Sequence, residues 1–400
     1  MKAGNAIIPS TEPGTPAAAA GCRKLRINYV LPLPNMSGGV KSSRLIAEAM
    51  VRRGHDVRLV FPVKLHPLPS ILHPRTWIKV VWKRLRLLGQ ANQHHLVQSI
   101  AQMIPVRRHF VDAGDAPDAD VTIASWWATM ESVAGWPDCK GVKVHYIRGY
   151  EVFHHQRTRV EAVYRLDVAK VVIGSWMRRV MQEQYGMDAV VIPNGIDWSQ
   201  FGSNRRSKSP RPTVGVVYVP THLKGAHTAF EAIRIVQRTL PQTRVVSFGV
   251  SRILRQHKIP ANFSFCYQPA QNDIAGIYRS ADCWIVPSIS EGLSMPGLEA
   301  AACRCPIVAT RCGGTEDYVR DGVNGYLVPV EDPHQMADRI IDVLQARDEQ
   351  WGQMSEASYG IAQLFNWDRS AALLEAVLLE AVDGRRSGAV SLRAPCGRSD

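Results

Sequence analysis

The sequence predicts an α/β fold built from two doubly wound domains, each with a parallel sheet covered by helices. Short apolar, β-branched runs alternate with helix-like segments along the chain, which is typical of such sheets. The 400 residues are 46% hydrophobic, so the chain can bury a sizeable core, and this length usually means two or more domains. A polar stretch rich in glycine and proline interrupts the alternation near the middle, which indicates a boundary between two domains.

The predicted strands are short and mostly apolar, as strands buried on both faces of a parallel sheet are. In the first half they lie at residues 24–33, 55–62, 120–127, 143–149 and 169–176. In the second half they lie at residues 212–219, 243–250, 261–267, 283–288, 306–312 and 324–330. Ligands of such domains bind outside the carboxyl ends of the strands.

The domain boundaries follow from this pattern and from composition. Both ends of the chain have the polar, glycine- or proline-bearing character of disordered tails. We expect an N-terminal tail at 1–22, a first domain at 23–192, a linker at 193–212, a second domain at 213–366, a last helix at 367–383 and a C-terminal tail at 384–400.

The first residues faintly resemble a lipoprotein cleavage site, AAAAGC at 17–22. Pro9, Glu12, Pro13 and Pro16 interrupt the apolar core of about 7–15 residues that an export signal needs. No run reaches the roughly 18 apolar residues of a transmembrane helix. We therefore expect a cytoplasmic protein.

The segment at residues 285–329 is the most informative part of the sequence about function. A strand-like run, IVPS, is followed by a loop of small residues and then by a helical pattern, and Glu291 and Glu299 stand eight positions apart across the loop. Free backbone N–H groups at such a loop and helix start favour a ligand that carries oxygens or negative charge. Both carboxylates can face the same ligand.

This pair resembles the E-x₇-E signature of the retaining glycosyltransferases of family 4. The resemblance continues from Leu25 to about Val382: residues 27–60 look like the family's first strand, glycine loop, helix and second strand. PNGID, within residues 190–201, matches the family's hinge between domains, and residues 311–333 match the segment that follows the motif helix.

The resemblance implies the GT-B fold, in which two Rossmann-like domains face a central cleft and the final helix returns to the N-terminal acceptor domain. It implies transfer of a sugar from a nucleotide diphosphate sugar, the donor, to a hydroxyl group, with the anomeric configuration kept. It implies no metal and no cofactor, because the sugar nucleotide is a substrate.

Donor-binding residues are carried over position by position. Lys224 matches the family's donor-phosphate lysine, Glu291 would contact the sugar hydroxyls, and Glu299 would accept hydrogen bonds from the ribose. A carboxylate suits a vicinal diol because its two oxygens can accept two donors. The loop backbone would hold the sugar through residues Gly292, Leu293, Ser294 and Met295.

In the first domain, Gly38 and Gly39 follow a strand and precede a predicted helix, where they let a backbone approach the donor phosphates or the acceptor. The family places a histidine that contacts the donor sugar after a later strand of this domain. Arg148 fits that place by position and His145 by residue type, so both remain candidates. Glu151 is close enough in sequence to contribute to acceptor binding.

Two positions depart from the family's pattern. No arginine stands near Val219, where a second phosphate clamp is usual, although His222 or Arg252 could substitute for it. Arg304 stands where the family usually has glycine. These departures leave room for a catalytically silent protein that binds a sugar nucleotide or a partner, and a nucleotide-sugar epimerase is a further alternative.

Two other patterns predict structure instead of chemistry. Asp118-Ala119-Asp120 resembles a metal-binding D-x-D, but it precedes a strand, where turn aspartates are common. The cysteines at 303, 305 and 312 lack a fourth ligand nearby and are interpreted as small buried hydrophobes.

The formal net charge of +13 calls for a partner. Residues 75–95 fit a basic amphipathic helix with Trp77 on an apolar stripe, Trp82 beside the stripe, and Lys79, Lys83 and Arg86 on another side. This suits an anionic membrane surface, while a core-facing helix with a solvated basic edge is the alternative. No nucleic-acid module is visible. We therefore expect a peripheral protein at the inner face of the cell membrane, with a surface glycan or a lipid-linked glycan as acceptor.

Overall fold

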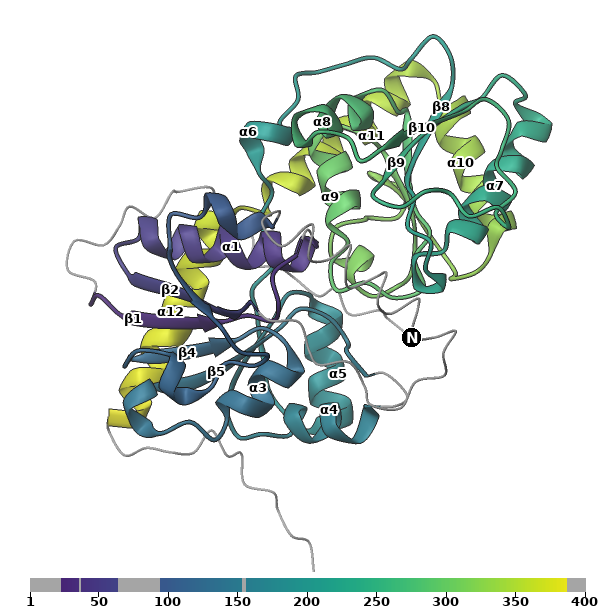
Figure 1. Cartoon of the computed structure of the whole chain (residues 1–400). Coiled ribbons are helices and arrows are strands. Elements are labelled where there is room, and N and C mark those ends of the chain that lie inside the picture. Colours follow the sequence, from purple (N-terminus) through teal and green to yellow (C-terminus); the bar gives the residue numbers. More distant parts are fainter. Residues whose placement is uncertain (1–22, 36, 64–93, 153–155, 387–400) are drawn as a thin grey trace, which may run out of the picture. The chain divides into compact units, whose positions relative to one another are not determined.

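The computed structural model describes residues 23–35, 37–63, 94–152 and 156–386. The chain forms two compact units (Figure 1). Unit 1 comprises residues 1–172, 180–192 and 368–400, and unit 2 comprises residues 173–179 and 193–367. The predicted tails at 1–22 and 387–400 lie outside the described residues, as does the predicted amphipathic helix except for its last two positions.

Unit 1 contains a seven-stranded parallel sheet in the order β3-β2-β1-β4-β5-β6-β7. The central strand β4 is buried at every position, which explains its mostly apolar sequence, and its one polar side chain, Thr122, donates to the carbonyl oxygen of Lys140. The strands are β1 (Arg26–Val30), β2 (Asp56–Pro62), β3 (Gln102–Val106), β4 (Val121–Ala124), β5 (Val142–Ile147), β6 (Ala169–Val172) and β7 (Val190–Val191).

The last helix, α12, packs on unit 1 through a buried polar cluster. Arg53, at the C-terminal end of α1, donates two hydrogen bonds to Glu375 of α12. His55 Nε2 lies 2.9 Å from Glu375 Oε1, and His55 Nδ1 accepts from the backbone of Leu25 at 3.2 Å. The helices are α1 (Gly38–Arg52), α3 (Trp127–Val133), α4 (Arg157–Tyr164), α5 (Ser175–Tyr185) and α12 (Trp367–Arg386). The first residues of α5, 175–179, and the first residue of α12 belong to unit 2.

Unit 2 contains a six-stranded parallel sheet in the order β10-β9-β8-β11-β12-β13. Its core packs α7 and α10 against the buried face of this sheet. The strands are β8 (Thr213–Val217), β9 (Arg244–Gly249), β10 (Phe263–Tyr267), β11 (Cys283–Val286), β12 (Ile307–Thr310) and β13 (Gly325–Val328). The helices are α6 (Trp198–Phe201), α7 (Ala226–Thr239), α8 (Gln271–Arg279), α9 (Met295–Ala302), α10 (Pro333–Gln345) and α11 (Asp348–Gln363).

Residues 193–212, the predicted linker, lie against unit 2 instead of forming a free connection. Phe201 is 1% exposed. Arg206 donates to the carbonyl oxygen of Ala281, and Lys208 Nζ donates to that of Ala346 at 2.7 Å. The glycines and prolines of this segment therefore belong to a packed part of unit 2 and do not indicate a flexible linker.

The predicted fold class is confirmed, and every predicted strand is present. The sequence did not predict β3 or β7, which are the two edge strands of unit 1. β3 is mostly exposed and contains Pro105, and β7 has only two residues, so neither carries the apolar signature of a central strand. The last helix runs to Arg386, beyond the expected end at residue 383.

Among the residues that the structure describes, none of the helices combines the length and the apolar character that crossing a bilayer requires.

Candidate active site

The strand order of unit 2 reverses between β8 and β11, because β9 and β10 lie on one side of this pair and β12 and β13 on the other. Ligands of doubly wound sheets bind at such a switch point, outside the carboxyl ends of the strands. Lys224 follows β8 and Glu291 follows β11. The topology therefore brings the two predicted donor-binding residues to this point.

A close backbone approach fixes Lys224 there. Lys224 ends a short 3₁₀ helix (His222–Lys224), and Gly225 after it has φ 64°. A Cβ atom at Gly225 would lie 1.9 Å from the carbonyl oxygen of Pro287, just after β11. Ile289 N–H also donates to the carbonyl oxygen of Leu223 at 2.9 Å. Only glycine allows the turn that carries Lys224 to rest on the end of β11.

Lys224 and Glu291 form an ion pair, with 2.7 Å between Lys224 Nζ and Glu291 Oε1. The same Oε1 accepts from Ser288 Oγ at 2.7 Å. The Lys224 side chain is 39% exposed and that of Glu291 is 11% exposed, so the ammonium group reaches solvent while the carboxylate is held. An ammonium has three donors, which leaves donors of Lys224 for a ligand.

The loop after Glu291 presents backbone donors. No hydrogen bond within the described part of the chain engages the N–H groups of Gly292, Leu293, Ser294 or Met295. Ser294 caps α9 with φ 60° and ψ 73°, a left-handed conformation that turns the chain sharply into the helix. Unpaired N–H groups at a helix start form a site for an oxygen-rich or anionic ligand.

Neighbouring segments of unit 2 hold this loop in place. Trp176 Nε1 donates to the carbonyl oxygen of Gly292 at 2.9 Å. A Cβ atom at Gly314 would lie 2.4 Å from the Cα atom of Leu293, so the loop after β12 also touches it. Glu291 exchanges backbone hydrogen bonds with Cys312 and Gly314, at 3.1 Å each. The sequence did not single out Trp176, although its place at the end of a strand-like run is a signal.

Glu299 lies on the first turns of α9, where its Oε2 accepts from Tyr278 OH at 2.9 Å. Tyr278 is fully buried on α8, and burial, followed by the charge of Glu299, raises the pKa of Tyr278 well above its usual value. The phenol therefore stays protonated and holds one oxygen of Glu299 in a fixed position.

In unit 1, the prediction that Gly38 and Gly39 precede the helix is wrong: they are the first residues of α1. The helix starts earlier than expected because Ser37 caps it, with Ser37 Oγ accepting from Val40 N–H at 3.4 Å. A glycine pair in the sequence does not reveal this cap. Both glycines are exposed, and a Cβ atom at Gly38 would meet nothing within 4 Å. Neither backbone strain nor packing requires glycine, so the space above this helix start is open.

Arg148 directly follows β5, as expected from its position. Its guanidinium donates to Ser42 Oγ of α1 at 2.6 Å and to Tyr29 OH of β1 at 2.8 Å, and it lies 4.6 Å from the ring centre of Tyr146. Burial opposes the charge, but the tyrosines and Glu151 outweigh it, so the pKa of Arg148 is raised. The side chain therefore links the ends of β1 and β5 to α1.

His145 lies inside β5, beside Lys170 of β6, and is fully buried. Neither ring nitrogen has a hydrogen-bond partner in the described residues. Burial, followed by the charge of Lys170, lowers the pKa of His145 to about 3. The residue is thus a neutral part of the core of unit 1, and the structure favours Arg148 over His145 as the group that reaches the carboxyl edge of the sheet.

Glu151 binds the start of α3. Its Oε2 accepts from Trp127 N–H at 3.1 Å, and its own N–H donates to Tyr164 OH at 3.0 Å. Burial raises the pKa of Glu151 to about 7, against the opposing effects of the Trp127 N–H and Arg148. The structure places this carboxyl group at the carboxyl edge of the unit 1 sheet.

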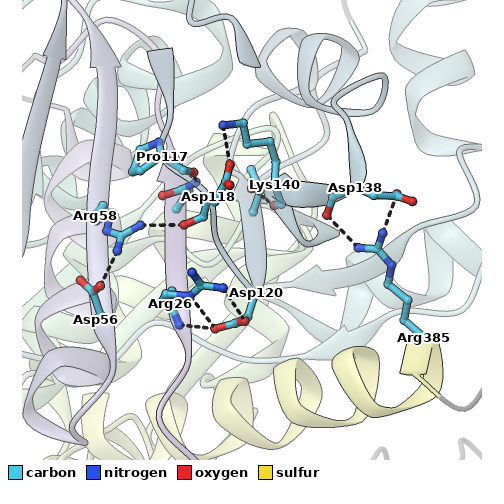
Figure 2. A network of polar contacts seen from close by, with 11 residues as sticks. Arg26, Asp56, Arg58, Pro117, Asp118, Asp120, Asp138, Lys140 and Arg385 are labelled. Carbon is cyan, nitrogen blue, oxygen red and sulfur yellow. Dashed lines mark hydrogen bonds and ion pairs between the residues drawn. The ribbon is translucent and has the colours of Figure 1, made fainter. Parts of the chain in front are cut away.

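Asp118 and Asp120 lie at the opposite, amino edge of that sheet and bind basic side chains (Figure 2). Asp120 Oδ1 lies 3.1 Å from Arg26 Nη2, and its Oδ2 accepts from the backbone N–H of Arg26 at 2.9 Å. Asp118 Oδ1 accepts from Lys140 Nζ at 3.0 Å, and its carbonyl oxygen accepts from Arg58. These contacts favour the structural interpretation of D-x-D.

Each candidate for the missing arginine lies near a neighbour other than Lys224. His222 Nε2 lies 3.7 Å from Glu331 Oε1, and Arg252 lies 5.7 Å from the ring centre of Tyr267. Arg304 has φ 65°, which explains why glycine suits this position. Here the Arg304 guanidinium donates to Glu356 Oε1 at 2.6 Å and lies 4.0 Å from the ring centre of Tyr359.

The three clustered cysteines are free thiols buried in unit 2. Burial raises the pKa of each, and that of Cys305 rises to about 11. The described residues contain no group of three or more side chains arranged to hold a metal ion.

Comparison with known proteins gives a family match for unit 2. Residues 202–360 match the model described as "Glycosyl transferases group 1". The predicted resemblance to the family-4 glycosyltransferases is therefore confirmed.

Similar proteins extend this finding. The chain is 40% identical over 215 residues to a D-inositol 3-phosphate glycosyltransferase of Arthrobacter sp. (strain FB24), a match over 48% of this chain and 50% of that protein. It is 33% identical over 134 residues to the protein of that name from Mycolicibacterium paratuberculosis, over 34% of this chain and 30% of the relative. The matches thus span no more than half the length of these curated relatives.

A solved structure of Anabaena HepE in complex with UDP-glucose is similar with a TM-score of 0.63 and 16% identity, over 90% of this chain and 100% of that one. The predicted GT-B fold is confirmed by this likeness.

The buried His145 gives a prediction for the pH dependence of stability. Between its folded pKa of about 3 and its usual value of 6.5, the unfolded chain binds the proton more tightly, so His145 lowers stability as the pH falls through this range. We expect His145→Leu to reduce this loss by up to about 1.4 kcal/mol per pH unit. Urea unfolding at pH 8, 6.5 and 5 measures it. A constant difference between variant and parent at all three pH values would contradict it.

Proposed function

We propose that this protein transfers a sugar from a nucleotide diphosphate sugar to a hydroxyl group of an acceptor, with retention of the anomeric configuration. The observation that carries the proposal is the meeting of an exposed ammonium, a held carboxylate and four unpaired backbone N–H groups at the switch point of unit 2. The match of residues 202–360 to the glycosyl transferases group 1 supports the same reaction.

The leaving diphosphate is the group whose charge must be stabilised. Lys224 Nζ and the start of α9 supply positive potential there, at donors that are already positioned before the ligand binds. The departing phosphate oxygen takes up the proton of the acceptor hydroxyl on the same face of the sugar, so no protein base is needed.

Glu291 and Glu299 orient the donor. Oε1 of Glu291 holds Lys224 and Ser288, and Oε2 has no partner in the described residues, so it can accept from a sugar hydroxyl. Glu299, fixed by Tyr278, accepts from the ribose. The UDP-glucose bound to the similar HepE structure supports a nucleotide sugar as ligand.

For the acceptor, we propose a surface glycan or a lipid-linked glycan at the inner face of the membrane. The basic amphipathic sequence at 75–95 supports this proposal. A similar solved structure with a TM-score of 0.57 and 15% identity, over 88% of this chain and 99% of that one, is WaaG, a glycosyltransferase involved in lipopolysaccharide biosynthesis.

The donor site is tested by two substitutions. Lys224→Ala removes a phosphate charge and Glu299→Gln a ribose acceptor, and each loss of a hydrogen bond to a charged group costs roughly 1.5–3 kcal/mol, or about 10- to 150-fold in affinity. Thermal-shift measurements with UDP, GDP and dTDP select the nucleotide, and calorimetric titration then gives its affinity. Lys208→Ala, which removes the same charge from a side chain that donates to the carbonyl oxygen of Ala346, is the matched control. Unchanged affinity in both test variants would refute this placement.

The proposed chemistry needs no divalent ion, because Lys224 and backbone N–H groups neutralise the diphosphate. We expect the rate of sugar-nucleotide turnover to be the same with and without excess EDTA. A loss of turnover that Mn²⁺ or Mg²⁺ restores would instead assign a metal to the reaction, and Asp118 and Asp120 would be the first residues to replace.

Membrane association is tested with vesicles. Each basic residue near an anionic surface contributes about 1 kcal/mol, and salt weakens the effect. We expect binding to anionic vesicles that falls as salt rises, and reduced binding when Lys79, Lys83 and Arg86 are replaced by Ser. Nucleotide affinity serves as the control and stays unchanged. If the triple variant and the parent sediment equally with anionic vesicles, the membrane proposal is refuted and the segment is interpreted as a core element.

A further inference from the structure

The sheet of unit 2 ends in a strand, β10, whose outer edge pairs with no other strand in the described residues. The residues that flank β10 bond to β9: the carbonyl oxygen of Asn262 accepts at 3.0 Å, and the N–H of Gln268 donates at 2.9 Å. Main-chain groups of successive residues in a parallel strand point alternately to its two sides. Those of Phe263, Phe265 and Tyr267 therefore point to the open edge.

The other sheet edges of the described residues are protected, and that of β10 is not. β3 contains Pro105, which has no N–H to offer, and β7 has only two residues. On β13, Leu327 N–H donates to Asp321 Oδ1 at 2.8 Å, and the carbonyl oxygen of Gly325 accepts from Gly322 at 2.8 Å. β10 reads FSFCY, without a proline, a glycine or a charge. An edge of this kind is a template for pairing with another strand.

The strand is held rigidly by its inner face. The ring centre of Phe263 lies 5.4 Å from that of Phe230 on α7 and 6.4 Å from that of Phe265. Both phenylalanines pack against the core of unit 2. Ser264 and Cys266, on the other face, are exposed. A second strand would therefore meet an edge that is already in place and that loses little conformational freedom on pairing.

The open edge is complementary to itself. In an antiparallel pair about a two-fold axis at Phe265, Phe265 faces its own copy and Phe263 faces Tyr267 of the second copy. Each of these pairs exchanges two N–H···O bonds, and aromatic side chains lie opposite each other. A register shifted by two residues leaves one pair unmade. Because β10 carries no charge, self-pairing brings no like charges together within the strand.

We propose that β10 pairs with β10 of a second copy of this chain, antiparallel and centred on Phe265, so that the sheets of two copies of unit 2 become continuous. A strand of a different protein would use the same main-chain groups, but it would not need the symmetric order of aromatic and small side chains that β10 has. The proposal goes beyond sugar transfer and uses none of the donor-site residues.

Sedimentation velocity of the full chain over a concentration series tests the dimer, and we expect a reversible monomer–dimer equilibrium. Tyr267→Pro removes one outward N–H from each copy, at a position that is 39% exposed and on an edge that tolerates proline. Tyr267→Ala is the matched control, because it removes the same ring and keeps the N–H. Two lost hydrogen bonds per dimer should raise the dissociation constant of the Pro variant about tenfold above that of the Ala variant. A parent that stays monomeric throughout, or equal constants for the two variants, overturns the proposal.

Disulfide formation tests the register. In the proposed pair, Ser264 lies opposite Cys266 of the second copy at a Cα separation of about 4.5 Å, within the roughly 4.4–6.8 Å that a disulfide spans. The two copies of Cys266 lie on a diagonal, about 7–8 Å apart, which is too far for a disulfide. We therefore expect oxidised glutathione to link two chains covalently when they carry Ser264→Cys, and not when Cys266 is the only thiol of β10.

The background for this test has Cys22, Cys139 and Cys396 replaced by Ser, which leaves Cys266 and four buried thiols. A variant with both Ser264→Cys and Cys266→Ser is the matched control and should stay unlinked. Linkage in the background or in this control contradicts the register centred on Phe265. A dimer in solution that Ser264→Cys does not link covalently places the interface elsewhere and overturns the proposal.

Discussion

The close approach of Gly225 to the carbonyl oxygen of Pro287 is the constraint on which the donor-side geometry depends. It locks the turn after β8 onto the end of β11, so Lys224 and Glu291, 67 positions apart in sequence, form an ion pair. Any side chain at position 225 would place its Cβ atom 1.9 Å from that oxygen and would push the turn away. The charge arrangement at the switch point is therefore a consequence of backbone packing, and the ion pair reports that packing instead of creating it.

The same loops leave main-chain donors unpaired because small residues let several segments crowd together. Gly314 approaches Leu293, and Trp176 takes the carbonyl oxygen of Gly292, so the loop is held by its carbonyl side. No hydrogen bond in the described residues engages its N–H groups. Donors fixed in this way need no rearrangement when an anionic ligand arrives, which is the condition for strong electrostatic stabilisation of a leaving group.

Central strands could be predicted because burial on both faces requires short apolar runs. The donor motif could be predicted because a tight loop requires small residues between its two glutamates. Edge strands could not: β3 is exposed and contains Pro105, and β7 is two residues long. The helix start at Gly38 depends on the cap that Ser37 provides, and a glycine pair alone does not reveal it. The choice between Arg148 and His145 required the structure, since sequence cannot tell a strand residue turned into the core from one at the strand's end. Trp176 was missed because its role is a contact across 116 positions.

The two sheets apply one topological rule to different chemistry. At the switch point of unit 2, an ammonium and unpaired N–H groups create positive potential, which suits a diphosphate. At the carboxyl edge of unit 1, charged side chains pair with one another instead, Arg159 with Glu131 and Arg108 with Asp112. Asp118 and Asp120 lie at the other edge of the unit 1 sheet, where they bind Lys140 and Arg26. Carboxylates at that edge stabilise strand starts, whereas Glu131 and Glu151, on the segments that follow the strands, hold Arg159 and the start of α3.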